Sequence, residues 1–509
     1  ASAGAGEILR ALAIGLRFSA AAAAKLLLPA IALWGILPVL PRRPIRRIFA
    51  VYVAVLGFLV PVICISDFLY FQESGKHFTY EATAYLGPAA WPMISGAFAM
   101  HPFALSAALM FCIALGVGSG YAAARLAASC GPPDDRSRPA WLIVLPVASA
   151  LAVVGLRGGA GRFNMSVGDA VISPNPYINA LCLDPVYAVL RTATSPEQVF
   201  AFGTEADNVR TVRALIGLGD STPDRPEYPL YRRSPGSPQG NRMNVVIFVL
   251  ESWSGKDIGC LGSPVKVTPF FDELAARGML FTRATATGLR TAEGVFTILC
   301  SFPNQPIKPI MSRYSVLQNR WRSLSQILEE AGYLNLFIHG RDLDFDRLRN
   351  FLWATHFRKI VDRRAFPLSA SLADDSWPGA DDEAVVRRAD AEFDAIRDRP
   401  FFAVVYTMNT HPPFSLAYTD HALRVFFELA KTRDYFRNTL FILVADHART
   451  RDRFTMASQH HVPLLLYAPD RVPARVNPAV ASQIDIAPTV LSLLELQTAH
   501  ACWGRDLLA

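Results

Sequence analysis

Four short apolar runs in the second half of the chain each end in a side chain that can bind a metal ion or a phosphate group. The runs and the residues that follow them are 244–250 before Glu251, 334–338 before His339, 401–408 before Asn409 and His411, and 439–445 before Asp446 and His447. Apolar runs of this length, rich in Val, Ile and Phe, are typical of strands buried on both faces of a parallel sheet. Ligands of such sheets bind beyond the carboxyl ends of the strands, so we expect these polar side chains to gather at one edge.

Glu251, Asp446 and His447 form a candidate metal site. Two carboxylates and one imidazole are a mixed set of hard and borderline donors. This set suits a single divalent ion, with Mn²⁺ or Zn²⁺ favoured and Mg²⁺ compatible. A fourth position remains open for a nucleophile. Each residue alone could be a helix cap or a surface histidine, but their shared placement at strand ends favours the functional interpretation.

The segment 288–296 (GLRTAEGVF) has the pattern of a loop that turns into a helix, with Thr291 near the first turn. Exposed N–H groups and the positive end of the helix dipole favour phosphate and an ionised hydroxyl at such a place. A threonine hydroxyl is a weak nucleophile at neutral pH, but coordination to a divalent metal can activate it. Threonine at this position is most often only an N-cap, so the segment alone does not establish catalysis.

The first half of the chain is much more apolar than the second. The chain has 509 residues, 51% of them hydrophobic, which is too long for one core and unusually apolar for a soluble protein. The segments long and apolar enough to span a bilayer are 19–40, 48–71, 103–128 and 141–156, the last being short. We therefore predict an N-terminal α-helical transmembrane bundle, with a buried helix as the alternative for the fourth segment.

The arginines between these segments predict the topology. Arg42, Arg43, Arg46 and Arg47 lie in the first connection, and Arg136 and Arg138 lie between the third and fourth segments. The positive-inside rule makes both connections cytoplasmic, which puts everything after about residue 157 outside, in the periplasm or beyond. The N-terminus then lies outside too, although the chain begins without Met. A missing upstream helix, giving five in all, or a cleaved signal peptide would account for this.

Three domains are predicted from these patterns. Residues 1–157 form the transmembrane domain, and residues 244–509 form an α/β catalytic domain. Residues 158–243 form the connector, with amphipathic patches at 186–191 and 209–216 followed by a Pro/Gly/Ser-rich run at 219–240. Such a run has no core to join and is expected to be an extended linker.

Net charge and cysteine content bear on partners and compartment. The formal net charge of +7 suits an anionic lipid surface, and without a basic helix, zinc finger or nucleic-acid motif we expect no nucleic-acid partner. The cysteines expected outside the membrane are Cys182, Cys260, Cys300 and Cys502. One disulfide among them would suit an oxidising periplasm, with free buried thiols as the alternative, and sequence does not choose a pairing.

Several motifs together resemble the lipoteichoic acid synthase-type phosphoglycerol transferases of the alkaline phosphatase/sulfatase superfamily. They are NVVIFVL-Glu251-Ser252-Trp253, Arg290-Thr291, Phe302-Pro303, Asn409-Thr410-His411-Pro412-Pro413-Phe414, Ala445-Asp446-His447, the segment 482–489 (SQIDIAPT) and Gly504-Arg505-Asp506-Leu507. The motifs cover roughly residues 240–509. The resemblance implies a sulfatase-like (alkaline phosphatase-type) domain with a mostly parallel central sheet, and a multi-pass protein of the bacterial inner (cytoplasmic) membrane.

The resemblance also assigns roles to individual residues. Glu251, Thr291, Asp446 and His447 would bind one Mn²⁺-like ion, with Thr291 as the nucleophile. The candidates for binding the substrate phosphate or headgroup are His411, Arg347, Phe345, His461 and His339. Phe345 stands where lipoteichoic acid synthases have Trp, and His460 is as good a candidate as His461.

The activity implied is transfer of phosphoglycerol from phosphatidylglycerol to a glycan or polymer hydroxyl through a phospho-threonine. The first alternative is a phosphoethanolamine transferase, which shares the threonine, the metal and the membrane plan. A sulfatase or phosphodiesterase-like hydrolase is the other alternative. Thr291 lacks the Cys/Ser-x-Pro-x-Arg context of a sulfatase, and a second cluster of Asp and His ligands cannot be assembled.

Overall fold

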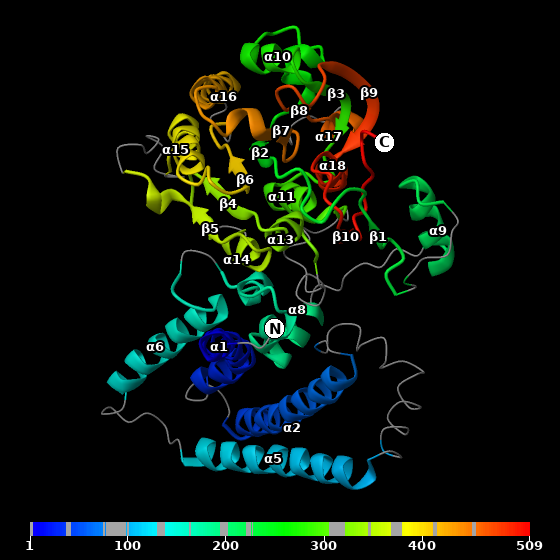
Figure 1. The fold of residues 1–509 in the computed structure, drawn as a ribbon. Coiled ribbons are helices and arrows are strands. Elements are labelled where there is room, and N and C mark those ends of the chain that lie inside the picture. Colours follow the sequence, from blue (N-terminus) through cyan, green and yellow to red (C-terminus); the bar gives the residue numbers. More distant parts are fainter. Residues whose placement is uncertain are drawn as a thin grey trace. The chain divides into compact units, whose positions relative to one another are not determined.

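The chain divides into two compact units, residues 1–200 and 201–509. The structure, a computed structural model, describes residues 4–36, 42–74, 77, 98, 101–129, 138–161, 164–193, 202–219, 225, 227–304, 321–344, 348–367, 379–410, 415–449 and 455–509. The first unit is helical and the second is built around a sheet (Figure 1). The three-domain division expected from the sequence stays a prediction beside this division into two units.

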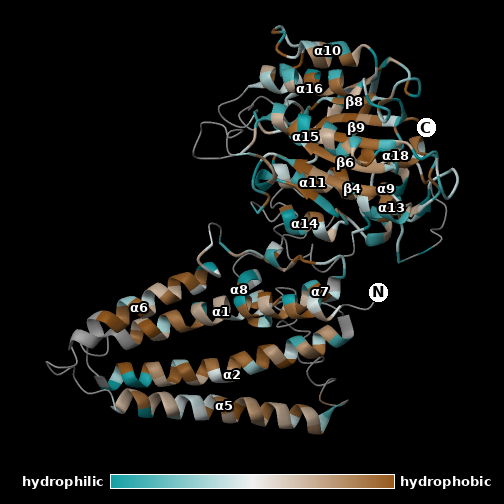
Figure 2. Ribbon diagram, turned by 60° about the vertical axis from the view of Figure 1, so that its left-hand side comes forward, coloured by the Kyte–Doolittle hydropathy of each residue, from teal (hydrophilic) through white to brown (hydrophobic). Residues whose placement is uncertain are grey.

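Long apolar helices make up most of the first unit, as the brown ribbons of Figure 2 show. Its helices are α1 (Ala5–Ile36), α2 (Arg42–Ser74), α5 (Pro102–Ser129), α6 (Arg138–Arg157), the 3₁₀ turn η1 (Val167–Ala170), α7 (Pro176–Leu181) and α8 (Pro185–Ala193). Small residues let the helices approach closely: a Cβ added at Gly116 of α5 would lie 3.0 Å from the Cβ of Phe58 in α2. Large apolar side chains remain exposed on the same helices, such as Leu16 and Phe103.

Three helices in the described part of the first unit are long and apolar enough to cross a membrane, namely Ala5–Leu33, Arg43–Gln72 and Pro102–Ser129. Helix α1 begins at Ala5, before the first predicted span at 19–40, and residues 37–40 of that span lie outside the described residues. The first turns of α1 contain charged residues, which is why the predicted span began after them. These charged residues have partners: Arg17 donates two hydrogen bonds to the carbonyl of Gly158, and Ser173 donates to Glu7. The predicted fourth span, 141–156, falls in α6, a 20-residue helix whose described residues include the apolar stretch Ile143–Arg157.

An eight-stranded, mostly parallel sheet forms the centre of the second unit, in the order β5-β4-β6-β2-β7-β8-β3-β9. Its strands are β2 (Asn244–Leu250), β3 (Met279–Thr285), β4 (Leu334–His339), β5 (Lys359–Val361), β6 (Phe401–Tyr406), β7 (Thr439–Ala445), β8 (Leu464–Tyr467) and β9 (Arg475–Ser482). Only β8 runs antiparallel to its neighbours. The predicted α/β fold with a mostly parallel central sheet is therefore confirmed.

Helices cover both faces of this sheet (Figure 1). The helices of the second unit are α9 (Glu205–Leu215), α10 (Pro269–Ala275), α11 (Thr291–Cys300), α13 (Leu324–Glu330), α14 (Leu348–Ala354), α15 (Asp382–Asp394), α16 (Leu416–Ala430), α17 (Met456–His460) and α18 (Ile486–Leu493), with short 3₁₀ turns η2 (Gly255–Asp257), η3 (Gly259–Leu261), η6 (Arg363–Ala365), η8 (Phe436–Asn438) and η9 (Gln483–Asp485). Side chains of α10, α15 and α16 pack on one face, and those of α11, α13, α14 and α18 pack on the other.

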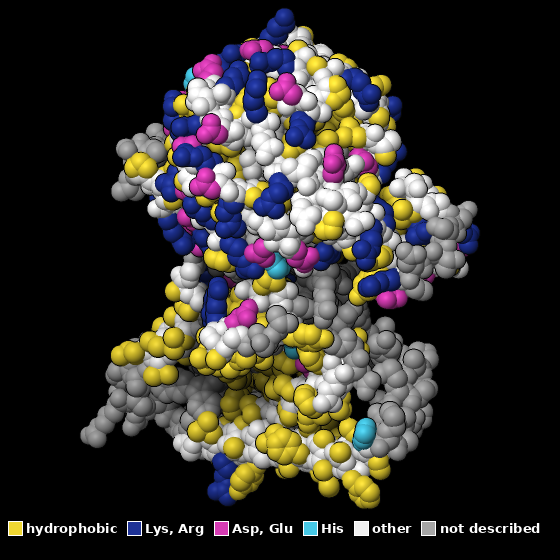
Figure 3. Space-filling model, in the orientation of Figure 1, with side chains coloured by type: hydrophobic (Ala, Val, Ile, Leu, Met, Phe, Trp, Pro, Cys, Tyr) yellow, Lys and Arg dark blue, Asp and Glu magenta, His cyan; other side chains and the backbone are white. Residues whose placement is uncertain are grey.

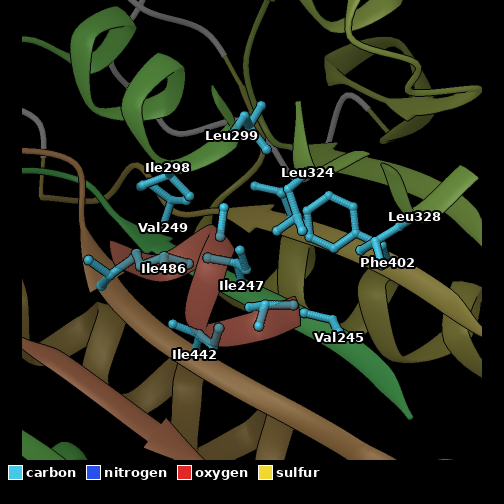
Figure 4. Packing of buried hydrophobic residues seen from close by; sticks show 14 of the residues in the cluster. Val245, Ile247, Val249, Ile298, Leu299, Leu324, Leu328, Phe402, Ile442 and Ile486 are labelled. Carbon is cyan, nitrogen blue, oxygen red and sulfur yellow. The ribbon is translucent and has the colours of Figure 1, made fainter. Parts of the chain in front are cut away.

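Strand β2 is buried on both faces, which explains its unbroken apolar sequence. Its alternate residues enter the two cores. Ile247 and Val249 lie on the side of α11 and α18, close to Ile298 and Ile486 in Figure 4. Phe248 enters the opposite core, where its ring packs edge-on against Phe426 at 4.8 Å.

Two of the four expected strands, 244–250 and 439–445, have the predicted bounds, but two other local expectations were wrong. The run 401–408 yields a strand that ends at Tyr406, so residues 407 and 408 belong to the following turn. The expected linker 219–240 contains β1 (Arg232–Arg233), which pairs with β10 (Ala499–His500). Part of this polar run therefore joins the second unit through backbone hydrogen bonds, which hydropathy does not reveal.

The six cysteines in the described part of the chain have free thiols. They include all four for which a disulfide was considered: Cys182, Cys260, Cys300 and Cys502. Cys182 and Cys502 are buried, and burial raises the pKa of Cys182 to about 12 and that of Cys502 to about 11. The alternative of free buried thiols therefore describes this structure.

Helix α11 lies against the end of β7 at Gly294. A Cβ at this position would be 2.3 Å from the carbonyl oxygen and 2.7 Å from the Cα of Asp446. Both are backbone atoms, which cannot rotate away. The absence of a side chain at Gly294 therefore lets the helix reach the strand end.

The substitution Gly294→Ala should lower the unfolding temperature. Helix propensity alone would make alanine more stable by about 1 kcal/mol. The clash with Asp446 should outweigh this, because overpacking costs about 1–3 kcal/mol. Thermal unfolding of the purified chain measures the sign. Gly118→Ala is the control, since an added Cβ in that part of α5 meets no heavy atom within 4 Å. A more stable Gly294→Ala variant would contradict the close approach.

Candidate active site

Adjacent parallel strands bring the first group of site residues together. Strand β2 pairs with β7 in a register that places Leu250 opposite Ala445. The next residues, Glu251 and Asp446, therefore leave the sheet side by side at its carboxyl edge. His447 follows directly. The gathering of these three side chains, predicted from the ends of the apolar runs, is confirmed.

The three side chains form a compact cluster that is almost inaccessible to solvent. The Nε2 atom of His447 lies 3.6 Å from Oε1 of Glu251 and 3.3 Å from Oδ2 of Asp446. One ligand atom from each residue lies within 4.8 Å of the others. This spacing allows all three to contact a single ion.

Thr291 is the first residue of α11, and its Oγ1 donates a hydrogen bond of 3.3 Å to Oε2 of Glu251. The N-cap of α11 is Arg290, whose side chain makes no capping hydrogen bond. The structure therefore does not support the interpretation of Thr291 as an N-cap. Its partly exposed hydroxyl lies beside the carboxylate cluster, at the end of the helix where the dipole is positive.

Backbone groups fix one oxygen of Asp446. Its Oδ1 accepts hydrogen bonds from the amides of Ser252, at 2.9 Å, and His447, at 2.7 Å. Ser252 has φ of +57°, a conformation that is rare for a residue with a side chain and that is often found at functional sites. Its hydroxyl donates to Oε1 of Glu251 at 2.7 Å. This one residue thus contacts both carboxylates.

The electrostatics of the cluster favour bound positive charge. Burial and the neighbouring charge of Glu251 raise the pKa of Asp446 to about 7. Burial also acts to raise the pKa of Glu251, but the charge of His447 and the hydrogen bonds from Tyr406 and Ser252 lower it overall. Burial acts to lower the pKa of His447, and the two carboxylates raise it overall. Two adjacent buried carboxylates repel each other, and a divalent cation would offset that repulsion.

The donor set fits a divalent ion. Two carboxylates, one imidazole nitrogen and the Thr291 hydroxyl provide oxygen and nitrogen ligands, as Mn²⁺, Zn²⁺ and Mg²⁺ sites use. The Nδ1 atom of His447 lies 2.8 Å from the carbonyl oxygen of Ala448. This contact favours a proton on Nδ1 and leaves Nε2 free to coordinate a metal.

His339 ends β4 but does not join the ligand cluster. Its ring packs edge-on against Tyr406 with 5.0 Å between centroids, and its Nδ1 lies 3.3 Å from the carbonyl oxygen of Tyr406. Burial lowers the pKa of His339 to about 4, so the imidazole is neutral at physiological pH. In this arrangement His339 borders the metal-binding residues through Tyr406.

Of the other residues predicted to bind substrate, the structure describes the contacts of the two histidines near β8 and does not describe the remaining three. His461 lies against Gly255 and places Nε2 3.0 Å from the carbonyl oxygen of Thr282. His460 places Nδ1 2.9 Å from the carbonyl oxygen of Ala286. Neither belongs to the described cluster that could hold the ion. His411, Arg347 and Phe345 lie outside the described residues.

Sequence reasoning missed Tyr406, the last residue of β6. Its hydroxyl lies 2.6 Å from Oε2 of Glu251 and 2.6 Å from Oδ2 of Asp446. The sequence analysis did not select Tyr406 because it ends an apolar run and is itself classed as a hydrophobic residue. A signal was available in its position, since it is the only side chain with a hydrogen-bonding group in 401–406.

Sequence reasoning also missed Asp382, the first residue of α15. Its fully buried carboxylate accepts hydrogen bonds from the amides of Met408, at 2.7 Å, and Asn409, at 3.1 Å. Thr410, which follows Asn409 in the same turn, donates a hydrogen bond to the carbonyl of Glu251. Asp382 therefore holds the turn after β6 against the metal cluster. No motif in its acidic surroundings distinguishes it from a surface carboxylate.

Known proteins are similar to this chain in sequence. The sulfatase family model matches residues 243–416 and 415–496. Among curated proteins, lipoteichoic acid synthase 1 of Bacillus subtilis is 23% identical over 321 residues, which cover 54% of this chain and 49% of that protein. The lipoteichoic acid synthase-like protein YvgJ of the same organism is 20% identical over 362 residues, covering 61% of this chain and 55% of that protein. The matches thus span about half the length of these relatives.

Solved structures show the same fold. An alkaline phosphatase superfamily protein from Vibrio parahaemolyticus is 29% identical, with a TM-score of 0.55 over 60% of this chain and 79% of that chain. The lipoteichoic acid synthase LtaP from Listeria monocytogenes is 19% identical, with a TM-score of 0.50 over 60% of this chain and 81% of that chain. This chain is a member of the alkaline phosphatase/sulfatase superfamily, and within it resembles the lipoteichoic acid synthases.

Proposed function

We propose that this protein is a membrane-bound, metal-dependent transferase that moves phosphoglycerol from phosphatidylglycerol to a glycan or polymer hydroxyl. The observation that carries the proposal is the contact of the Thr291 hydroxyl with Glu251, beside Asp446 and His447. A hydroxyl next to a one-metal cluster provides a protein nucleophile, which suits a covalent intermediate, and the acceptor that attacks this intermediate distinguishes transfer from hydrolysis.

The reaction proceeds by two displacements at phosphorus. A divalent ion bound by Glu251, Asp446 and His447, most suitably Mn²⁺, would favour ionisation of the Thr291 hydroxyl and offset charge on the phosphate. Oγ1 of Thr291 attacks the phosphodiester, diacylglycerol leaves, and glycerophospho-threonine remains. An acceptor hydroxyl then attacks this intermediate and releases Thr291. The first N–H groups of α11 favour the anionic phosphate at its N-terminus.

Recognition of the substrate rests on residues matched through the family resemblance. His411 and Arg347 are proposed to hold the phosphate, and Phe345 to border the glycerol headgroup. His461 and His339 complete the proposed substrate site. The neutral state of His339 suits a hydrogen bond to an uncharged hydroxyl.

The same proposal places the protein in the bacterial inner (cytoplasmic) membrane as a multi-pass protein, with the catalytic domain in the periplasm or outside. Its support lies in the apolar helices and in their connecting arginines. In Figure 3 hydrophobic side chains gather over the helices of the first unit, whereas charged side chains are spread over the second. A membrane anchor suits a donor lipid that does not leave the bilayer.

The donor and the nucleophile can be tested in one experiment. Purified chain incubated with Mn²⁺ and phosphatidylglycerol should release diacylglycerol, and peptide mass spectrometry should find glycerophosphate on Thr291. Thr291→Ala should lower turnover by about 1,000-fold or more, since it removes the nucleophile. Thr291→Ser keeps a hydroxyl and should retain measurable turnover. Full activity of Thr291→Ala would exclude this residue as the nucleophile.

Phosphatidylethanolamine is the matched alternative donor. We expect no diacylglycerol release from it and no phosphoethanolamine on Thr291. Phosphoethanolamine on Thr291 would replace the glycerol assignment and leave the nucleophile in place. Inorganic phosphate or free glycerophosphate released at the full rate without an acceptor would favour a hydrolase.

Removal of either carboxylate charge should weaken metal binding. We expect Asp446→Asn and Glu251→Gln to lower the affinity for Mn²⁺ by about 100-fold or more, since loss of an outer partner alone costs about 10–100-fold. Equilibrium titration of the chelated protein with Mn²⁺ measures this change. Asp420→Asn is the control, because Asp420 is also buried and also accepts two backbone hydrogen bonds, from Phe270 and Phe271. Unchanged Mn²⁺ binding in both site variants would refute the metal centre.

The proposed topology predicts a labelling pattern in intact cells. A membrane-impermeant thiol reagent should label Lys266→Cys in the second unit and should not label Arg43→Cys at the start of α2. Both positions are exposed, and the parent chain labelled in parallel corrects for native thiols. The reverse pattern would place the second unit in the cytoplasm.

A further inference from the structure

Tyr406 lies between the two carboxylates of the candidate metal site. It ends β6, the strand on the opposite side of β2 from β7. Its hydroxyl lies 2.6 Å from Oε2 of Glu251 and 2.6 Å from Oδ2 of Asp446. Only 1% of the residue is exposed to solvent. Its polar atom is therefore directed at the site and not at water.

Tyr406 makes the shortest contact to one oxygen of each carboxylate. The amides of Ser252 and His447 hold Oδ1 of Asp446, and the hydroxyl of Ser252 holds Oε1 of Glu251. Tyr406 contacts the second oxygen of each carboxylate. Two longer contacts also reach these oxygens: Thr291 Oγ1 donates to Oε2 of Glu251 at 3.3 Å, and Nε2 of His447 lies 3.3 Å from Oδ2 of Asp446. Without the phenol, each carboxylate would lose the shortest contact on that oxygen.

The proton count shows that these contacts are suited to a bound cation. A phenol has one proton and can donate it to one carboxylate at a time. With both carboxylates ionised, the other 2.6 Å contact joins two electron-rich oxygens. That contact is stabilised either by a proton on one of the carboxyl groups or by positive charge beside it. His447 supplies part of that charge, and a divalent ion would supply the rest.

The phenol itself is held rigidly. The backbone of Tyr406 pairs with Val249 on one side and with His339 on the other. The His339 ring stands edge-on to the phenol at an interplanar angle of 89°. The hydroxyl position is thus set by the centre of the sheet, which makes it a fixed reference point for both carboxylates.

We propose that Tyr406 is a positioning residue that aligns Glu251 and Asp446 toward one divalent ion and thereby sets the affinity of the site for metal. This inference rests on the metal centre of the proposed function. Tyr406 acts through the ligands and is not assigned a contact with the substrate. An ordinary buried tyrosine, such as Tyr435 with its hydroxyl 2.7 Å from Asp390, satisfies a single carboxylate.

The test compares Tyr406→Phe with Tyr435→Phe in the full-length chain in detergent. Both changes remove one buried hydroxyl and its bond to an aspartate, so the loss of general stability is matched. After chelation, the protein is titrated with MnCl₂ and free Mn²⁺ is measured by electron paramagnetic resonance. Tyr406→Phe should weaken Mn²⁺ binding by about 10–100-fold, the range for loss of an outer-shell partner. Tyr435→Phe should bind Mn²⁺ as the parent does.

Wild-type Mn²⁺ affinity in a folded Tyr406→Phe variant would overturn this inference and leave the metal centre standing. Absence of Mn²⁺ binding in the parent chain would overturn the metal centre itself. A second measurement does not depend on the folding of the variant. 3-Fluorotyrosine placed at 406 retains the hydroxyl, and its ¹⁹F resonance should shift when Zn²⁺ is added. The same label at 435 should not shift, and an unmoved resonance at 406 would also overturn the inference.

Discussion

The electrostatic repulsion between two buried carboxylates is the constraint on which the site depends. Glu251 and Asp446 leave neighbouring strands at adjacent positions and are both shielded from water. Burial penalises each charge, and proximity adds repulsion. His447, Ser252 and Tyr406 partly compensate through charge and hydrogen bonds. The remaining demand for positive charge is what makes this strand edge a candidate metal centre.

Strand register is what enforces this unfavourable proximity. The sheet around β2 is buried on both faces, so a slip of one residue would exchange the residues of the two cores. The packing of residues such as Ile247 and Phe248 therefore fixes where the strands end. The cost of bringing the carboxylates together is met by burial of apolar surface along the whole strand. The catalytic geometry is thus a consequence of core packing several residues away.

The sequence predicts the parts of this arrangement that depend on pattern. Unbroken apolar runs give the central strands, and the polar residues that follow them give the metal cluster. Interactions between residues that are distant in the sequence are harder to predict from the sequence. The contribution of Tyr406 depends on which strands flank β2, an order that local sequence does not contain.

Two local features were not predicted, for related physical reasons. The turns of α1 before residue 19 contain Arg17, and the sequence predicted a span that begins only after it. The Arg17 side chain binds a carbonyl at the end of α6. The polar run before β2 suggested a free linker, yet Arg232 pairs with His500 in a small sheet. In both places hydropathy described single residues correctly and missed their distant partners.

In the proposed function, the residues that carry out the chemistry are different from those that select the substrate. The proposed nucleophile and the metal ligands lie at the ends of β2 and β7 and at the start of α11, where the cores fix them. The residues proposed for headgroup recognition, Phe345, Arg347 and His411, come after β4 and β6 in the sequence and lie outside the described residues. Connections tolerate sequence change better than buried strands do. A family with this plan could therefore change its donor or acceptor while retaining the same attack on phosphorus, which is consistent with a superfamily named for sulfatases and phosphatases that also includes lipoteichoic acid synthases.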